Sequence, residues 1–136
     1  MPVDEVSAMD ADLEQQVRAF AAVRIAIGAA ALVAPGLGVR KWLGPDSDGP
    51  GARLLMRMAG GRDVALGIGT LFAVRHGSPV RGWLEAGMLA DTTDLVGSLF
   101  AVRHLRRVPV TAGALSSLGA AAYGRRLISR LPAAPA

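Results

Sequence analysis

The sequence predicts an all-α protein: a bundle of four transmembrane helices in up-down order, with buried arginine–carboxylate pairs. Apolar residues make up 51% of the 136 residues and charged residues only 19%, while glycine occupies 17 positions. Small apolar residues at this density are typical of helices that pack closely in a membrane. The apolar residues also gather in four segments of about 20 residues, the length that crosses a bilayer core. Runs of basic residues separate these segments, as expected for residues at a membrane surface.

Turn-forming residues set the boundaries of the apolar segments. The first segment ends near Pro35, and the loop at 43–52 is dense in Gly, Pro and Asp. We predict an acidic N-terminal tail at 1–18, a four-helix membrane domain at 19–130 and a flexible C-terminal tail at 131–136. The four predicted helices lie at about 19–38, 54–74, 82–102 and 108–124.

A soluble helical bundle that binds an apolar ligand is the alternative fold, because charged residues interrupt three of the four segments. A soluble helix of about 20 residues should carry a broad polar stripe. Residues 64–74 and the whole of 108–124 carry no charge. We therefore favour the membrane bundle.

Charged residues near the middle of the predicted helices should pair with one another inside the bundle, because a lone charge in the bilayer centre is costly. Comparing their depths pairs Arg62 with Asp94 or Asp91, and Arg24 with Glu85. Such a network can be structural, fixing the register of the helices, and we favour this interpretation. In the alternative, Asp63, Asp91 and Asp94 form a proton or cation site. The whole predicted network comprises Arg24, Arg57, Arg62, Asp63, Glu85, Asp91 and Asp94.

An internal repeat relates the second and third segments. Residues 63–76 and 91–104 are identical at eight of fourteen positions, and both end in Leu-Phe-Ala-Val-Arg-His. Consecutive membrane helices joined by a short loop run antiparallel, so the two copies would form a small inverted repeat, an arrangement known from transporters. Transport does not follow from this similarity alone.

Residues at the predicted helix ends are interpreted as anchors at the membrane surface. The two histidines would lie on opposite membrane faces, so they cannot bind one metal or haem together. Cysteine is absent, and no catalytic residue, metal site or cofactor is predicted. The predicted anchors are Arg75, His76, Arg103, His104, Trp42 and Tyr123.

Residues 17–105 contain Arg24, Gly28 and Pro35 in the first segment, an Arg-x-x-Gly-x-Arg-Asp motif at 57–63, and Asp91 with Asp94 in the third segment. These motifs resemble those of an uncharacterised actinobacterial family of small four-helix integral membrane proteins. The resemblance implies the fold and a membrane location, but it carries no established activity.

We expect a non-catalytic accessory or structural subunit of a larger membrane assembly, in contact with the lipid bilayer and with other subunits or a second copy of itself. The alternative is a small proton-coupled transporter or channel. Nucleic-acid binding is not expected, because the basic runs alternate with apolar segments instead of sharing a face with aromatic residues. The expected location is the plasma (inner) membrane, multi-pass, with cytoplasmic termini, although arginine and lysine are equally numerous on the two faces.

Overall fold

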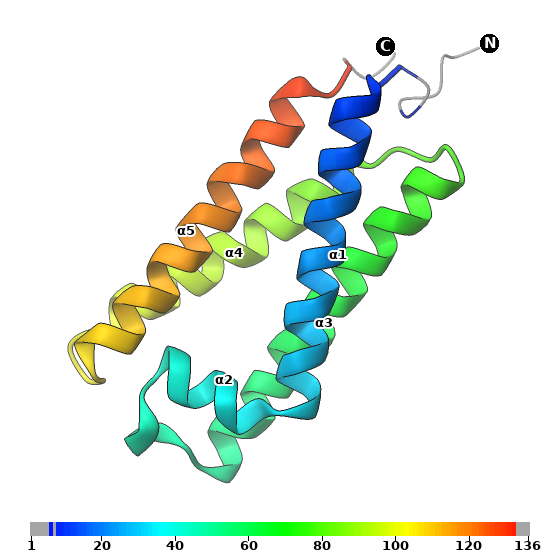
Figure 1. The fold of residues 1–136 in the computed structure, drawn as a ribbon. Helices are drawn as coiled ribbons and strands as arrows, with labels where there is room; N and C mark the ends of the chain where they lie inside the picture. Colours follow the sequence, from blue (N-terminus) through cyan, green and yellow to red (C-terminus); the bar gives the residue numbers. More distant parts are fainter. Residues whose placement is uncertain (1–5, 7, 133–136) are drawn as a thin grey trace.

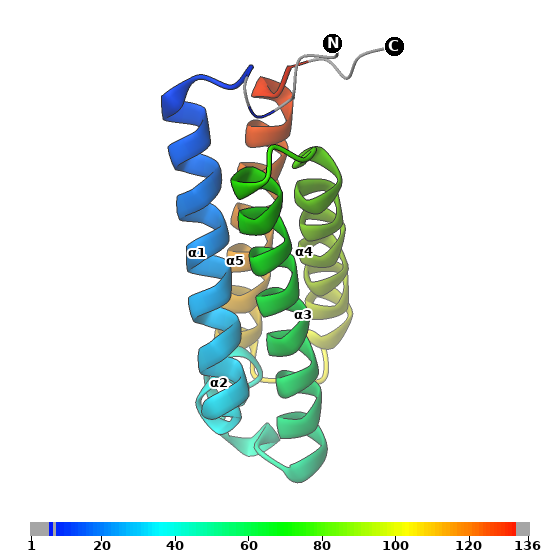
Figure 2. The same ribbon diagram turned by 90° about the vertical axis from the view of Figure 1, so that its right-hand side faces the viewer.

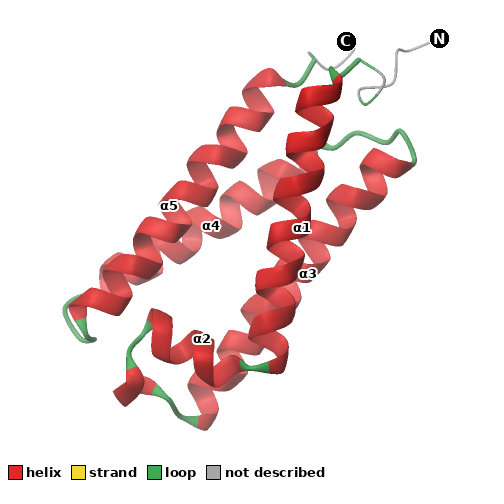
Figure 3. Cartoon of the chain, in the orientation of Figure 1, coloured by secondary structure: helices red, strands yellow, loops and turns green. Residues whose placement is uncertain are grey.

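The computed structural model describes residue 6 and residues 8–132, and it is helical throughout (Figure 1, Figure 3). Its elements are α1 (Ala11–Val33), α2 (Pro35–Trp42), the 3-10 turn η1 (Pro45–Ser47), α3 (Pro50–Arg75), α4 (Arg81–Ala101) and α5 (Arg107–Arg130).

The N-terminal boundary predicted at residue 18 is wrong, because α1 begins at Ala11. The Asp10 side chain accepts a hydrogen bond from the backbone N–H of Leu13 at 2.6 Å and so caps the helix. The next two turns bury Leu13 and Val17, which the prediction had placed in an acidic tail. Residues 1–5 and 7 of that tail lie outside the described residues.

Proline 35 begins a helix instead of only ending one. Helix α1 ends before Ala34, and α2 then starts with Pro35 at its first position. The backbone N–H that proline lacks would have no partner within the helix at this position. The described residues therefore form five α-helices, and the predicted set of four is wrong. The short α2 turns back across the end of the bundle that lies opposite the termini (Figure 1).

The long helices form two antiparallel pairs, α1 with α3 and α4 with α5 (Figure 1, Figure 2). The first pair is held at a close crossing of Gly28 and Gly60. A Cβ atom on either residue would lie 2.6 Å from the carbonyl oxygen of the other. At this distance no side chain fits, so the backbone contact requires glycine on both helices.

The main apolar core lies at the end of the bundle that holds the termini. Here the start of α1, the end of α3, the start of α4 and the end of α5 meet. Leu131, which was predicted to lie in a flexible tail, is buried in this cluster at 7% exposure, while residues 133–136 lie outside the described part of the chain. The buried members are Leu13, Val17, Ala73, Val74, Val80, Leu84, Leu127 and Leu131.

Helix length and composition contradict the predicted bundle of four transmembrane helices. Among the described residues, α1 is the one helix both long and apolar enough to cross a membrane. The α3 and α4 helices carry several charged residues along their lengths, and α5 is rich in Ala, Gly and Ser. The core helix of a soluble protein or a signal sequence can share the length and composition of α1.

Large apolar side chains project outward from every α-helix. Examples are Ile27 on α1, Leu37 on α2, Phe72 on α3, Phe100 on α4 and Leu115 on α5. The exposure of Phe72 is 61% and that of Phe100 is 77%. Exposed large apolar side chains are thus spread over all five α-helices of the described chain.

Candidate functional site

A buried arginine on α1 joins the two helix pairs. Arg24 is 8% exposed, and its Nη1 donates to Oδ1 of Asp63 on α3 at 3.0 Å. Its Nη2 donates to Oδ2 of Asp91 on α4, which is also buried. One guanidinium thus connects three helices, and the prediction that Arg24 pairs with Glu85 is wrong.

A second arginine makes a two-point contact next to the first. Arg62 on α3 donates from Nη1 to Asp94 Oδ1 at 3.0 Å and from Nη2 to Asp94 Oδ2 at 2.7 Å. It also reaches Oδ1 of Asp63 at 3.2 Å from Nη2. Asp94 was one of the two partners expected for Arg62. Paired parallel hydrogen bonds of this kind fix the geometry of both side chains as well as binding them.

The Arg24 guanidinium lies between an aromatic ring and a glycine. Its Cζ is 5.4 Å from the centre of the Phe20 ring, a cation–π contact. On α4, a Cβ atom added to Gly87 would lie 3.5 Å from the same Cζ, so the backbone there closely approaches the guanidinium. These contacts and the two carboxylates set the position of the charge within the bundle.

Two residues predicted to belong to the buried network lie outside it. Glu85 is exposed on α4. Arg57 is also exposed, and its Nε donates to the carbonyl oxygen of Leu32 at 3.3 Å, near the end of α1. This bond satisfies one of the carbonyl groups that a helix leaves free at its C-terminus. The network therefore consists of Arg24, Arg62, Asp63, Asp91 and Asp94.

Trp42 and Tyr123, which were predicted to be surface anchors, are half-buried and pack against other helices. The Trp42 Nε1 donates to Ser98 Oγ on α4 at 3.1 Å, and its indole packs against Gly113 of α5. Tyr123 contacts the apolar core, and its ring packs edge-on against Phe20 with centroids 5.3 Å apart.

The other four predicted anchors lie at helix ends on the protein surface. Arg75 is the last residue of α3 and His76 follows it, whereas Arg103 and His104 lie in the turn after α4 at the other end of the bundle. The His76 ring stacks on Phe72 at 3.9 Å, and its Nδ1 lies 2.9 Å from the Phe72 carbonyl oxygen.

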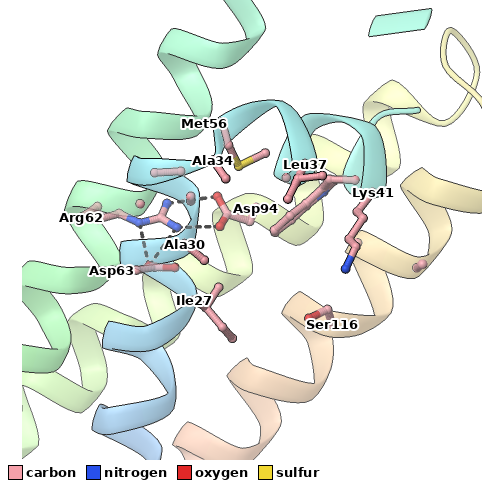
Figure 4. Close-up of a pocket in the computed structure, with 17 residues that line it drawn as sticks. Ile27, Ala30, Ala34, Leu37, Lys41, Met56, Arg62, Asp63, Asp94 and Ser116 are labelled. Atoms are coloured by element: carbon pink, nitrogen blue, oxygen red, sulfur yellow. Dashed lines mark hydrogen bonds and ion pairs between the residues drawn. The ribbon is translucent and has the colours of Figure 1, made fainter. Parts of the chain in front are cut away.

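A cavity of about 480 Å³ opens beside the charge network, between the two helix pairs and α2 (Figure 4). Arg62, Asp63 and Asp94 form one part of its wall, and Lys41 of α2 lies at another (Figure 4). A second cavity of about 520 Å³ shares Trp42, Met56, Ala59 and Asp94 with the first. Neither cavity was predicted from the sequence, because α2 contributes to the walls of both and was not predicted.

An aspartate in the loop before α3 binds two arginines. Asp48 Oδ1 accepts from Arg53 Nε at 2.6 Å, and its Oδ2 accepts from Arg40 Nε at 2.8 Å. The hydrogen bonds from Arg53 and then Arg40 lower the pKa of the Asp48 carboxyl to about 2. These pairs tie the end of α2 to the start of α3. The flanking Arg40 and Arg53 around an acidic turn are the signal in the sequence that could have revealed them.

The buried network is suited to holding helices together more than to chemistry. Each of its three carboxylates accepts hydrogen bonds from an arginine, and the two guanidinium groups are shared among them, with Asp63 bound by both. Among the described residues, no three His, Asp or Glu side chains gather where a metal ion could bind. Comparison with protein-family models, with curated proteins and with solved structures finds no match to this chain. The resemblance to the actinobacterial family therefore rests on the sequence motifs alone.

Proposed function

We propose that this protein is a non-catalytic accessory subunit of a membrane assembly, anchored through α1. Its apolar exterior would be covered by lipid and by the helices of another membrane subunit or a second copy of the chain. The observation that carries this proposal is the outward orientation of large apolar side chains on every α-helix.

The distribution of residues between inside and outside supports the proposal. Near the middle of the bundle, the contacts between helices consist of glycine crossings and ion pairs, as at Gly28 and Gly60 and around Arg24. Large side chains such as Phe100 and Leu89 point outward instead. Covering apolar surface is worth about 25 cal/mol per Å² in water, so leaving it bare is costly. Lipid or an apolar partner surface removes this cost.

Pairing of the acidic residues favours a structural role over proton transport. Asp91 and Asp94 each accept from an arginine, and Asp63 accepts from two. A proton carrier needs a carboxyl group that gains and loses its proton during the cycle. The guanidinium groups favour the charged form of the carboxylates that they bind, and they repel other cations.

Membrane fractionation tests the proposal. Full-length protein should sediment with the inner membrane of its host, resist extraction by alkaline carbonate and dissolve in mild non-ionic detergent. In that detergent, cross-linking followed by native mass spectrometry should give an assembly of fixed stoichiometry, either with another subunit or with a second copy. Replacing the exposed Phe100 with Ser should weaken that assembly if this face of α4 lies in the contact.

Two other outcomes of this fractionation and cross-linking would overturn the proposal. A stable monomer in the aqueous fraction, without detergent, would show that the apolar exterior needs neither lipid nor partner. A detergent-solubilised monomer with no cross-linked species would retain the membrane location but exclude the subunit role.

A further inference from the structure

We propose that the cavity between the two helix pairs binds a long-chain fatty acid, with the carboxylate at Lys41 and the alkyl chain inside. The cavity is lined by α1, α2, α3 and α5 together with Asp94 of α4 (Figure 4). This binding goes beyond the proposed subunit role and does not depend on it.

The walls of the cavity are suited to an alkyl chain. Ile27, Leu37 and Met56 contribute flexible apolar side chains, and several Ala and Gly residues leave the remaining space open. The volume of about 480 Å³ lies within the range of small-molecule binding cavities, which is about 300–1,000 Å³. Such cavities are mostly apolar, with few polar groups to orient the ligand. A single long apolar chain matches this description.

The charges around the cavity select an acidic head group. The Arg62 guanidinium is bound by Asp94 and Asp63, and Asp63 also accepts from Arg24, so these three wall residues already have partners. Lys41 differs, since its ammonium group makes no ion pair or hydrogen bond within the part of the chain that the structure describes. Its neighbour Arg40 is bound by Asp48. Among the charged residues of the cavity wall, Lys41 is therefore the one without a partner in the described part of the chain, and its positive charge complements a carboxylate.

Lys41 and Ser116 lie on the side of the cavity away from the Arg62–Asp94 pair (Figure 4). Both are exposed, so a charged head group placed there would lie at the surface of the chain and not in its interior. The alkyl chain would extend from this opening past Ile27 and Leu37 toward Met56. This orientation keeps the carboxylate away from Asp94, which would repel it.

Trp42 provides a built-in reporter of occupancy, because its side chain lines the cavity. The protein has one other tryptophan, Trp83, which packs against Gly69 of α3. In a Trp83→Phe background, reconstituted in nanodiscs of an unbrominated phosphatidylcholine, a bromine-labelled stearic acid should quench Trp42 fluorescence saturably. Bromine quenches tryptophan on contact, so saturation reports binding at a cavity that Trp42 lines. Trp42 lines both cavities, and Ala112, which lines only the first, distinguishes them.

Two pairs of variants test where the carboxylate and the alkyl chain of the fatty acid bind. Lys41→Gln should weaken binding of the acid about threefold to fivefold, the size of effect expected for one exposed ion pair. Arg125→Gln, which removes an exposed positive charge outside the cavity, should leave the affinity unchanged. Ala112→Leu fills the cavity from α5 and should abolish saturable quenching. Ala122→Leu adds the same bulk on an exposed position of α5 outside both cavities and should have no effect.

The nature of the head group is tested with two further probes. A bromine-labelled alcohol of the same chain length should bind the parent protein more weakly than the acid does. The affinity of the alcohol for Lys41→Gln should equal its affinity for the parent protein. Equal affinity of acid and alcohol for the parent protein would overturn the role of Lys41. Equal quenching by a bromine-labelled phosphatidylcholine would assign the cavity to a bilayer lipid and overturn the fatty-acid proposal. Quenching that never saturates, or that survives Ala112→Leu, would overturn binding at this cavity altogether.

Discussion

Asp63 and Asp91 occupy equivalent positions in the internal repeat, and they bind the two terminal nitrogens of one guanidinium, that of Arg24. The repeat lies on two consecutive antiparallel helices, so its two aspartates approach the same point from α3 and α4. This gives the repeat a structural explanation. Duplicated acids on neighbouring helices create a binding place for one arginine from a third helix.

Neutralising Asp91 should destabilise the protein. Asp91→Asn leaves the buried Arg24 with a single carboxylate, and we expect a loss of about 3 kcal/mol in the free energy of unfolding. This is the low end of the range for breaking a buried ion pair, since Asp63 remains. Equilibrium denaturation of the purified protein measures the loss, and reduced abundance in the cell should accompany it.

A double substitution distinguishes the cost of leaving Arg24 without Asp91 from the cost of losing the Arg24–Asp91 ion pair itself. Arg24→Leu with Asp91→Leu removes both members of the pair, and Arg62 still neutralises Asp63 and Asp94 in part. We expect the double variant to be more stable than Asp91→Asn, because buried pairs often exchange for apolar residues at little cost. A fully stable Asp91→Asn variant would show that the Arg24–Asp91 contact contributes nothing to the stability of the fold. It would favour the alternative in which Asp91 belongs to a proton or cation site.

Adjacent glycines on α3 should respond oppositely to alanine. Gly60→Ala places a Cβ atom 2.6 Å from the carbonyl oxygen of Gly28, so the helices must separate, at a cost of about 1–3 kcal/mol. Gly61→Ala meets nothing within 4 Å and should stabilise the helix by up to about 1 kcal/mol. Thermal unfolding of the two variants compares them directly. Equal melting temperatures would mean that α1 and α3 do not cross at this point.

Gly113 should be required for the position of Trp42. In Gly113→Ala the new Cβ atom would lie 2.3 Å from Trp42 Nε1, so the indole must move and its hydrogen bond to Ser98 must break. We expect the Trp42 emission, recorded in a Trp83→Phe background, to shift and become more accessible to a soluble quencher. Gly119→Ala, on the same helix with open space around it, is the control and should leave the spectrum unchanged. Identical spectra for the two variants would contradict the packing of Trp42 against α5.

The loop before α3 should lose stability in acid through Asp48. Its pKa in the folded protein is about 2, below the ordinary value of 3.8, so the folded state binds this proton less readily than the unfolded state. The stabilisation is therefore fully present above pH 3.8 and is lost as the pH falls toward 2. Asp48→Asn should reduce the stability difference between about pH 5 and about pH 2 in unfolding experiments. Arg53→Gln, which removes the larger cause of the shift, should do the same in part. If wild type and Asp48→Asn lose stability in parallel over this range, the assigned pKa is wrong.

The sequence predicts which charged residues belong to the buried network better than it predicts which of them bind one another. Depth along straight helices paired Arg62 with Asp94 or Asp91, because all three residues lie near the middle of their predicted helices, and the structure has Arg62 bound to Asp94. It assigned Glu85 to Arg24, whereas Glu85 points outward and Arg24 reaches Asp63 and Asp91. Depth alone says nothing about rotation around the helix axis, and this rotation decides which side chains face the interior.

Small residues gave a similar partial result. Their density predicted close helix packing, and α1 and α3 do cross closely. The contact uses Gly60 and Gly67, whereas the neighbouring Gly61 meets nothing within 4 Å. In a chain rich in Ala and Gly, several faces of one helix carry small residues, so their density does not select the face in contact.

The sequence by itself determined that this protein is helical and rich in small residues, and that it carries a set of intrahelical charges that must be paired. These properties follow from composition and local periodicity, which depend only on neighbours along the chain. The tertiary structure alone decided which acids bind Arg24, where α2 turns back, and which residues enclose the cavity. Each of these depends on contacts between residues far apart in the chain, such as Trp42 with Ser98 and Gly113, and local patterns do not specify such contacts.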